Sequence, residues 1–95
     1  MYVLTADQRG SRSDRDRVAD LLSTYAGAMT VRPFERTAGD EVQAVFDDAA
    51  TVAAVAVELT VSGHWSVGIG VGAVDEPLPA QTRAGRGPSF EYART

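Results

Sequence analysis

Two aspartates in short polar stretches are the residues of this sequence best suited to chemistry. Asp7 follows an apolar run that begins at Tyr2, and Asp40 lies in the turn Ala38-Gly39-Asp40. An Asp in a turn is ordinary, because Asp tolerates tight turns. Two carboxylates brought close together repel each other unless a cation lies between them, and Mg²⁺ held with phosphate oxygens is the usual solution. A metal site at these residues therefore depends on whether the fold brings Asp7 and Asp40 together.

The hydrophobic pattern predicts the element order β-α-β-β-α-β. The first strand is nearly continuous in apolar residues, which is typical of a strand buried on both faces. Each predicted helix carries one apolar stripe at helical spacing. The predicted strands cover residues 2–6, 31–35, 42–46 and 65–74, and the second and third of them form a hairpin. The first predicted helix begins at the capping sequence Ser13 to Asp16, ends near Gly27 and has the apolar stripe Val18, Leu21, Leu22 and Tyr25. The second predicted helix covers about 49–59, is capped by Asp48, ends at Ser62-Gly63 and has the apolar stripe Val52, Val55, Ala56 and Leu59.

The last two strands alternate, and their alternation assigns residues to faces. In the hairpin strand, Val42, Ala44 and Phe46 share one side, and Glu41, Gln43 and Val45 share the other. In the last strand, Trp65, Val67, Ile69 and Val71 share one face, opposite Ser66, Gly68, Gly70 and Gly72. Glycine weakens a strand, so this glycine face predicts that something approaches the backbone closely. The alternative is that the glycines allow helix packing or a bend.

This order predicts a single α+β domain over residues 1–95 with a ferredoxin-like fold. Its four-stranded antiparallel sheet has the strand order 4-1-3-2, and the helices lie on one face. Strands one and three are then neighbours, so the end of one lies beside the start of the other, about 5 Å away. We expect Asp7 and Asp40 to meet at one edge of the sheet as Mg²⁺ ligands. The alternative is that both are solvated turn residues.

Several residues with phosphate-binding character accompany this pair. The loop after the first strand has backbone N–H groups and a glycine that can adopt a positive φ, features that suit a phosphate. Pro88 starts a third predicted helix, which the sequence cuts short, so we expect the natural protein to continue. The candidate phosphate ligands are Gln8, Arg9, Gly10 and Ser11 in the loop, with Arg83, Arg86 and Arg94 as further cations.

Composition excludes several classes of site. The chain has no cysteine and one histidine, His64, so zinc-thiolate and multi-His sites are excluded. There is no lysine, which excludes a P-loop. The net charge of −4 argues against direct nucleic-acid contact within this chain. No apolar stretch is long enough to span a membrane, and the N-terminus lacks the pattern of a signal peptide, so we expect a cytoplasmic protein.

These stretches together resemble the catalytic domain of class III nucleotidyl cyclases. The similar segments are Ala6 to Ser11, Ala38 to Phe46, Val67 to Gly72 and Ala93-Arg94. In that family two aspartates bind metal ions and the active site forms between two subunits. The resemblance therefore implies Mg²⁺, a nucleoside triphosphate ligand and a homodimer. Phe90 stands where the family has an asparagine, and no lysine is present to read a purine base, so the resemblance implies a degenerate site.

Several stretches of the sequence are also similar to the SatD family of bacterial regulators. Tyr2 to Arg12, Pro33 to Glu41, Trp65 to Gly70 and Thr82 to Pro88 carry this resemblance. It implies a regulatory domain that precedes a helix-turn-helix-like region beyond Thr95. We therefore expect a SatD-like regulatory domain that binds metal and nucleotide phosphate. An active nucleotide-converting enzyme and a structural dimerisation module of a transcriptional regulator are the alternatives.

Overall fold

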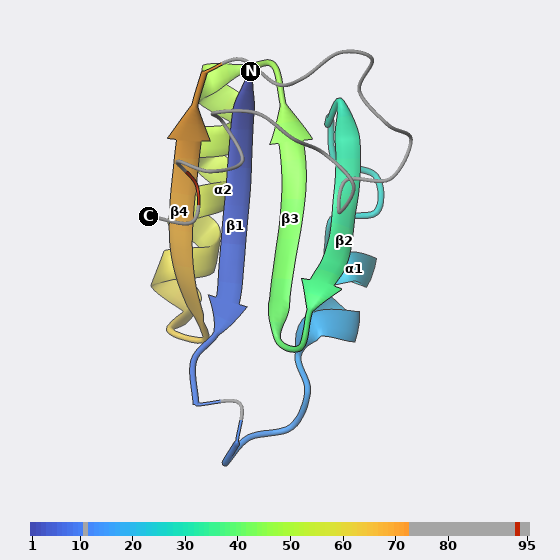
Figure 1. Cartoon of the computed structure of the whole chain (residues 1–95), viewed down its shortest axis with the longest axis vertical. Coiled ribbons are helices and arrows are strands. Elements are labelled where there is room, and N and C mark those ends of the chain that lie inside the picture. The colour runs from blue at the N-terminus through green and yellow to red at the C-terminus, as the bar shows by residue number, and fades with distance from the viewer. Residues whose placement is uncertain (11, 73–92, 94–95) are drawn as a thin grey trace.

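The structure, a computed structural model, describes residues 1–10, 12–72 and 93. It contains the predicted β-α-β-β-α-β order, in a four-stranded antiparallel sheet with the strand order β2-β3-β1-β4 (Figure 1). This is the order 4-1-3-2 read from the opposite edge, so the predicted ferredoxin-like α+β fold is confirmed. The elements are β1 (Tyr2–Gln8), α1 (Val18–Thr24), β2 (Arg32–Ala38), β3 (Glu41–Phe46), α2 (Ala49–Ser62) and β4 (Trp65–Val71).

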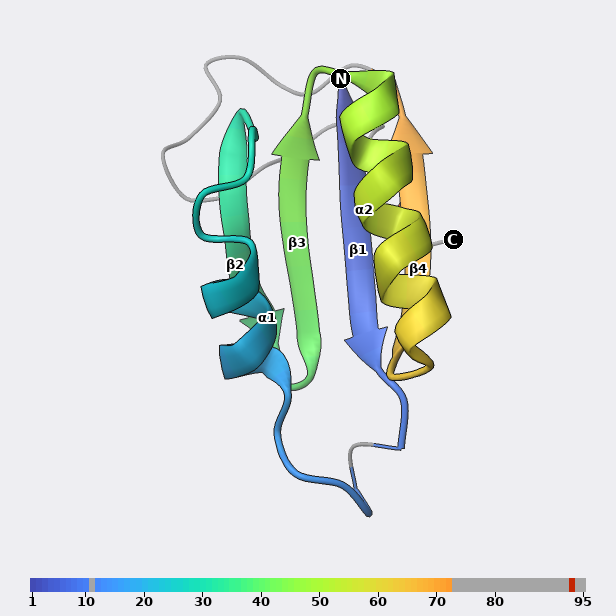
Figure 2. The same ribbon diagram turned by 180° about the vertical axis from the view of Figure 1, so that it is seen from behind.

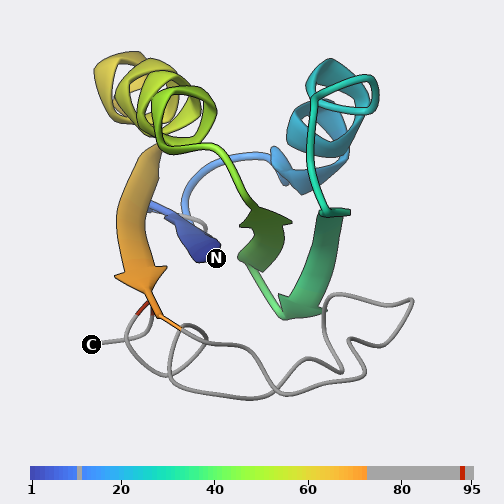
Figure 3. The same ribbon diagram turned by 90° about the horizontal axis from the view of Figure 1, so that it is seen from above.

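Both helices lie on the same face of the sheet, which we call the helix face (Figures 2 and 3). Alternation places one set of strand residues here, including Leu4, Ala6 and Phe46, and these pack with the helices into the larger core cluster. The opposite face, called the second face, holds a smaller cluster of Val3, Val45 and Ala93. Because β1 contributes to both clusters, its nearly continuous apolar sequence is explained, as predicted.

Helix α2 begins and ends where its sequence predicts. Asp48 is the N-cap, and its side chain accepts a hydrogen bond from the Thr51 backbone N–H at 2.8 Å. This bond satisfies one of the donors left unpaired at a helix start. The hydrogen bond from the Thr51 hydroxyl at 2.7 Å, followed by the bond from the Thr51 backbone N–H, lowers the pKa of Asp48. Gly63 ends the helix with φ of 80°, a left-handed conformation that glycine adopts without strain. The residues Val52, Val55 and Leu59 of the predicted stripe are buried.

Helix α1 departs from the prediction at both ends. It is only seven residues long, and the predicted capping box at Ser13 to Asp16 is wrong, because the N-cap is Arg17, with no side-chain cap. Asp16 instead accepts a hydrogen bond from the Val18 N–H at 3.0 Å. At the other end the helix stops at Thr24, before Gly27. A short apolar stripe sets which face of this helix is buried but leaves its ends loosely specified.

The predicted close approach to the glycine face of β4 is present at Gly68. A Cβ added to Gly68 would lie less than 3.0 Å from the carbonyl oxygen of Ala93, a separation that real Cβ atoms do not show. The approaching residue belongs to the same chain. The strand itself ends at Val71 rather than at the predicted residue 74. The predicted third helix, apart from Ala93, lies outside the described residues.

No helix among the described residues combines the length and the apolar character that a membrane crossing requires.

Candidate functional site

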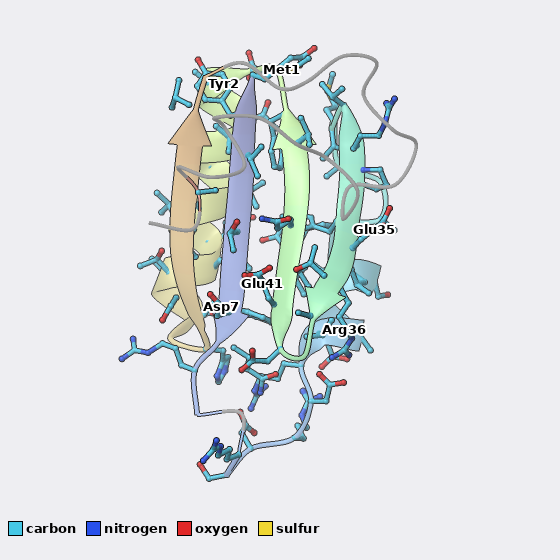
Figure 4. The ribbon with its side chains drawn as sticks, in the orientation of Figure 1. Met1, Tyr2, Asp7, Glu35, Arg36 and Glu41 are labelled. Atoms are coloured by element: carbon cyan, nitrogen blue, oxygen red, sulfur yellow. The ribbon has the colours of Figure 1, made fainter. Side chains whose placement is uncertain are left out.

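A polar pocket opens on the second face of the sheet, near the end of β1 and the start of β3. Its volume is about 210 Å³. Figure 4 shows two labelled carboxylates, Asp7 from β1 and Glu41 from β3, lying close together in this part of the sheet. The residues that line the pocket are Thr5, Asp7, Glu41, Ser66, Val67, Gly68 and Ala93. Three neighbouring strands therefore contribute to one hollow, together with the residue that approaches Gly68.

The strand register explains why Asp7 and Glu41 face each other. Asp7 is the direct cross-strand partner of Glu41 in the antiparallel β1–β3 pair. The next position along, Gln8, donates its backbone N–H to the Asp40 carbonyl at 3.1 Å, so Gln8 and Asp40 form a hydrogen-bonded pair. Pairs alternate in an antiparallel ladder, which makes Asp7 and Glu41 a non-hydrogen-bonded pair. Cα atoms in such pairs lie about 4.5 Å apart, and their side chains lie closer than in the other kind of pair.

A buried polar pair anchors the floor beside these carboxylates. Thr5 and Gln43 are cross-strand partners one step further into the sheet, and both are almost completely buried. The Gln43 side-chain N–H donates to the Thr5 hydroxyl at 3.0 Å. A buried hydrogen bond of this kind holds two neighbouring strands in one register, because a slip would leave polar groups unsatisfied. The register that aligns Asp7 with Glu41 is thereby fixed.

Glu41 has a further partner on the neighbouring strand. The Thr37 hydroxyl of β2 donates a hydrogen bond to the Glu41 carboxylate. This contact orients the Glu41 side chain, while Asp7 is exposed. Two carboxylates on adjacent strands therefore border the pocket.

Asp40 lies at the same end of the sheet as Asp7, but the cross-strand partner of Asp7 is Glu41 and not Asp40. It belongs to the turn between β2 and β3, in which Gly39 has φ of 52°. Its backbone carbonyl accepts from Gln8, and it is not among the residues that line the pocket. The sequence analysis missed Glu41 as a site residue. It placed Glu41 on one side of the hairpin strand, and the register of β1 against β3 shows that Asp7 lies on that same side.

The predicted phosphate loop has structural contacts of its own. The Gln8 side chain is buried, donates to the Arg15 carbonyl at 2.7 Å and accepts from the Arg17 N–H at 2.8 Å. The backbone N–H of Arg9 donates to the His64 carbonyl at 2.7 Å, which extends the pairing beyond β1. Gly10 has φ of 64°. Phosphate binding by this loop stays a prediction.

Four of the predicted phosphate ligands fall outside the part of the chain that the structure describes. They are Ser11, Arg83, Arg86 and Arg94.

Charged residues next to the loop form ion pairs at the same end of the molecule. Asp14 pairs with Arg17 at 2.6 Å, and this hydrogen bond lowers the pKa of Asp14. Asp16 pairs with Arg36 of β2 at 2.7 Å. The hydrogen bond from the Val18 N–H and then the Arg36 contact lower the pKa of Asp16. These exposed pairs tie the segment before α1 to itself and to the β2–β3 hairpin.

The donor set of the pocket fits a hard cation that brings further ligands with it. Across residues 1–10, 12–72 and 93, no group of three or more His, Cys, Asp or Glu residues is arranged to hold a metal ion. Asp7 and Glu41 are two carboxylates, and Mg²⁺ is commonly bound by one or two carboxylates while waters and substrate phosphates complete its shell. The residues present therefore fit a metal ion that arrives with a phosphate ligand.

No family model, curated protein or solved structure matches this chain. Its membership of the SatD family and its relation to nucleotidyl cyclases stay predictions from the sequence.

Proposed function

We propose that this chain is a regulatory domain, of the SatD type, that binds a divalent metal ion together with the phosphates of a nucleotide. The observation that carries the proposal is the cross-strand pair of Asp7 and Glu41 on the border of a polar pocket. Two carboxylates so close together favour a cation between them. The hydroxyl-bearing residues Thr5 and Ser66 line the same pocket, and oxygen atoms are the ligands that Mg²⁺ prefers.

Asp40 and Glu41 are alternative candidates for the second metal ligand beside Asp7. Both residues lie at the tip of the β2–β3 hairpin, next to the end of β1. Glu41 has the cross-strand position opposite Asp7, whereas the likeness to nucleotidyl cyclases favours Asp40. Substituting each one separately decides between them.

Isothermal titration calorimetry with Mg²⁺ and ATP or GTP tests the proposal. We expect wild-type protein to bind the metal–nucleotide complex, and Asp7→Asn and Glu41→Gln each to weaken binding by about 10- to 100-fold, the value of one charge-assisted contact. Asp47→Asn is the matched control, because this exposed aspartate follows the opposite end of β3. Absence of binding, or binding that Asp7→Asn and Glu41→Gln leave unchanged, contradicts the proposal.

An active nucleotide-converting enzyme is the second candidate, because the same carboxylate pair suits metal-assisted phosphoryl chemistry. Chromatography of ATP and GTP after incubation with protein and Mg²⁺ separates the two candidates. The regulatory proposal expects the nucleotide to be recovered unchanged. A cyclic or cleaved product that disappears in Asp7→Asn would establish the enzyme instead.

A further inference from the structure

The two edge strands of the sheet are protected to very different degrees. Strand β2 contains Pro33, carries charges at Arg32, Glu35 and Arg36, and shifts register twice against β3. Proline, charge and irregular pairing are the features that keep an edge strand from joining another sheet. Strand β4 has no charged residue and no proline, and it pairs with β1 without interruption from Trp65 to Val71. Among the described strands, β4 is therefore the edge that is built to accept another strand.

The hydrogen-bond pattern shows which residues of β4 direct their backbone groups outward. The Arg9 N–H donates to the His64 carbonyl, and the Gly72 N–H donates to the Met1 carbonyl. The backbone groups of His64 and Gly72, the residues on either side of β4, therefore point toward β1. Antiparallel pairs alternate, so the even-numbered residues of β4 face β1 and the odd-numbered residues face away. Outward-directed backbone groups therefore belong to Trp65, Val67, Ile69 and Val71, the same residues whose side chains lie on the helix face.

An uncharged apolar surface adjoins this edge. It combines Ile69 and Val71 of β4, which are 39% and 59% exposed, with Val57 and Val61 of α2, which are 61% and 79% exposed. Between the two elements lies a hollow of about 360 Å³, lined by Ala56, Val57, Thr60, Val61, Val67 and Ile69. We call this the β4–α2 surface. Large apolar residues gathered next to an open strand edge mark an interaction site.

The one charged residue of α2 is turned away from this surface. The Glu58 carboxylate accepts a hydrogen bond from the Tyr25 hydroxyl at 2.8 Å, which draws it toward α1. The β4–α2 surface therefore carries no charge, although the chain has a net charge of −4. A partner of matching chemistry must also present an uncharged apolar face and a free strand edge. Within the part of the chain that the structure describes, a second copy presents both, and it does so without bringing carboxylates together.

We propose that the β4–α2 surface is a homodimer interface, in which β4 pairs antiparallel with β4 of a second copy about a two-fold axis at Ile69. Outward-facing residues then pair with outward-facing residues, so that Ile69 faces Ile69 of the second copy and Val67 faces Val71. This register brings the exposed Val71 of each copy beside Val67, in the hollow between β4 and α2. Two four-stranded sheets become one continuous sheet of eight strands.

Light scattering coupled to size-exclusion chromatography tests the interface. The wild-type chain should elute with twice its monomer mass of 10.1 kDa. Ile69→Lys places two like charges opposite each other and should weaken the dimer by at least about 100-fold. Val61→Lys, on the exposed side of α2, should also weaken it, and circular dichroism verifies that both variants fold. Met29→Lys is the matched control, because Met29 is 83% exposed outside this surface, and it should leave the dimer intact.

Cross-linking tests the register. The sequence contains no cysteine, so Ile69→Cys introduces one thiol per copy. Directly opposed residues of a hydrogen-bonded pair have Cα atoms about 5.5 Å apart, which suits a disulfide. Oxidised Ile69→Cys should run as a covalent dimer on a non-reducing gel, and Met29→Cys should not. A monomeric wild-type chain, a dimer that survives both lysine substitutions, or no cross-link at Ile69 overturns the proposal. The pocket at Asp7 lies on the second face, so nucleotide binding can fail without affecting this result.

Discussion

Replacing Gly68 by alanine tests the close approach of Ala93 to strand β4. The new Cβ would lie less than 3.0 Å from the Ala93 carbonyl oxygen, which must retreat to at least the 3.4 Å of ordinary van der Waals contact. Overpacking of this kind costs about 1–3 kcal/mol. Removing a glycine from a strand interior returns about 0.5–1 kcal/mol. The difference lies between about 0 and 2.5 kcal/mol. We therefore expect Gly68→Ala to lower the free energy of unfolding by about 1 kcal/mol, a fall in Tm of roughly 4–8 °C.

The sign of this change is the informative result, because the two effects oppose each other. If Ala93 did not lie against β4, only the favourable effect would remain and Gly68→Ala would stabilise the protein. Gly27→Ala is the matched control, since a Cβ added at Gly27 meets nothing within 4 Å. We expect that control to be neutral or stabilising by up to about 1 kcal/mol. Urea denaturation followed by circular dichroism measures both variants, and a stabilising Gly68→Ala would refute the contact.

Two further predictions concern polar groups on the helix side of the molecule. Gln8→Ala leaves the Arg15 carbonyl and the Arg17 N–H without their side-chain partner and should cost about 1–3 kcal/mol in urea denaturation, so a loss below about 0.5 kcal/mol would contradict this role. Burial and the hydrogen bond to Glu58 raise the pKa of Tyr25 to about 12, and ultraviolet titration of the phenolate should show Glu58→Gln lowering that pKa. Because the folded-state pKa is raised, the stability that Tyr25 contributes is complete below pH about 10 and is lost as pH rises through about 12. An unchanged titration curve in Glu58→Gln would contradict the effect of Glu58 on the pKa of Tyr25.

Much of the fold could be predicted because the spacing of apolar residues indicates which segments are helices and which are strands. The stripe of α2, its Asp48 cap and its Gly63 end are local signals, and the structure confirms all three. The strand order follows from the β-α-β-β-α-β pattern, which few topologies accommodate. Helix α1 was less predictable. Its capping sequence resembles a helix start, yet the segment before Val18 is held by Gln8 and by the ion pair between Asp16 and Arg36, and these partners are distant in sequence.

The candidate site was predictable in position but not in composition. Adjacency of β1 and β3 places Asp7 and Asp40 at one end of the sheet, and the sequence indicates this. Which hairpin residue faces Asp7 depends on a shift of one residue in register, because each such shift moves a side chain to the other face. The buried pair of Thr5 and Gln43 fixes that register, and no local signal in either strand reveals that the two residues will meet.

The contact between Gly68 and Ala93 illustrates a different limit of sequence reasoning. Three glycines on one face of the predicted strand over 65–74, two of which lie in β4, predicted either a close approach to the backbone or helix packing or a bend. The sequence does not identify the approaching residue, which lies 25 positions further along and reaches β4 only through the tertiary fold. Ala93 also lines the pocket beside Asp7, so this contact shapes the candidate site as well as the core of the second face.

Paramagnetic broadening by Mn²⁺ tests the central claim, a metal site between Asp7 and Glu41, most directly. Mn²⁺ prefers the same oxygen ligands as Mg²⁺. In the presence of a nucleoside triphosphate, we expect substoichiometric Mn²⁺ to broaden the backbone amide signals of Thr5, Asp7, Glu41 and Ser66 first, and Asp7→Asn to abolish this selectivity. Broadening that begins instead at the exposed carboxylates of residues 14–20, or that spreads evenly over the molecule, would contradict the account.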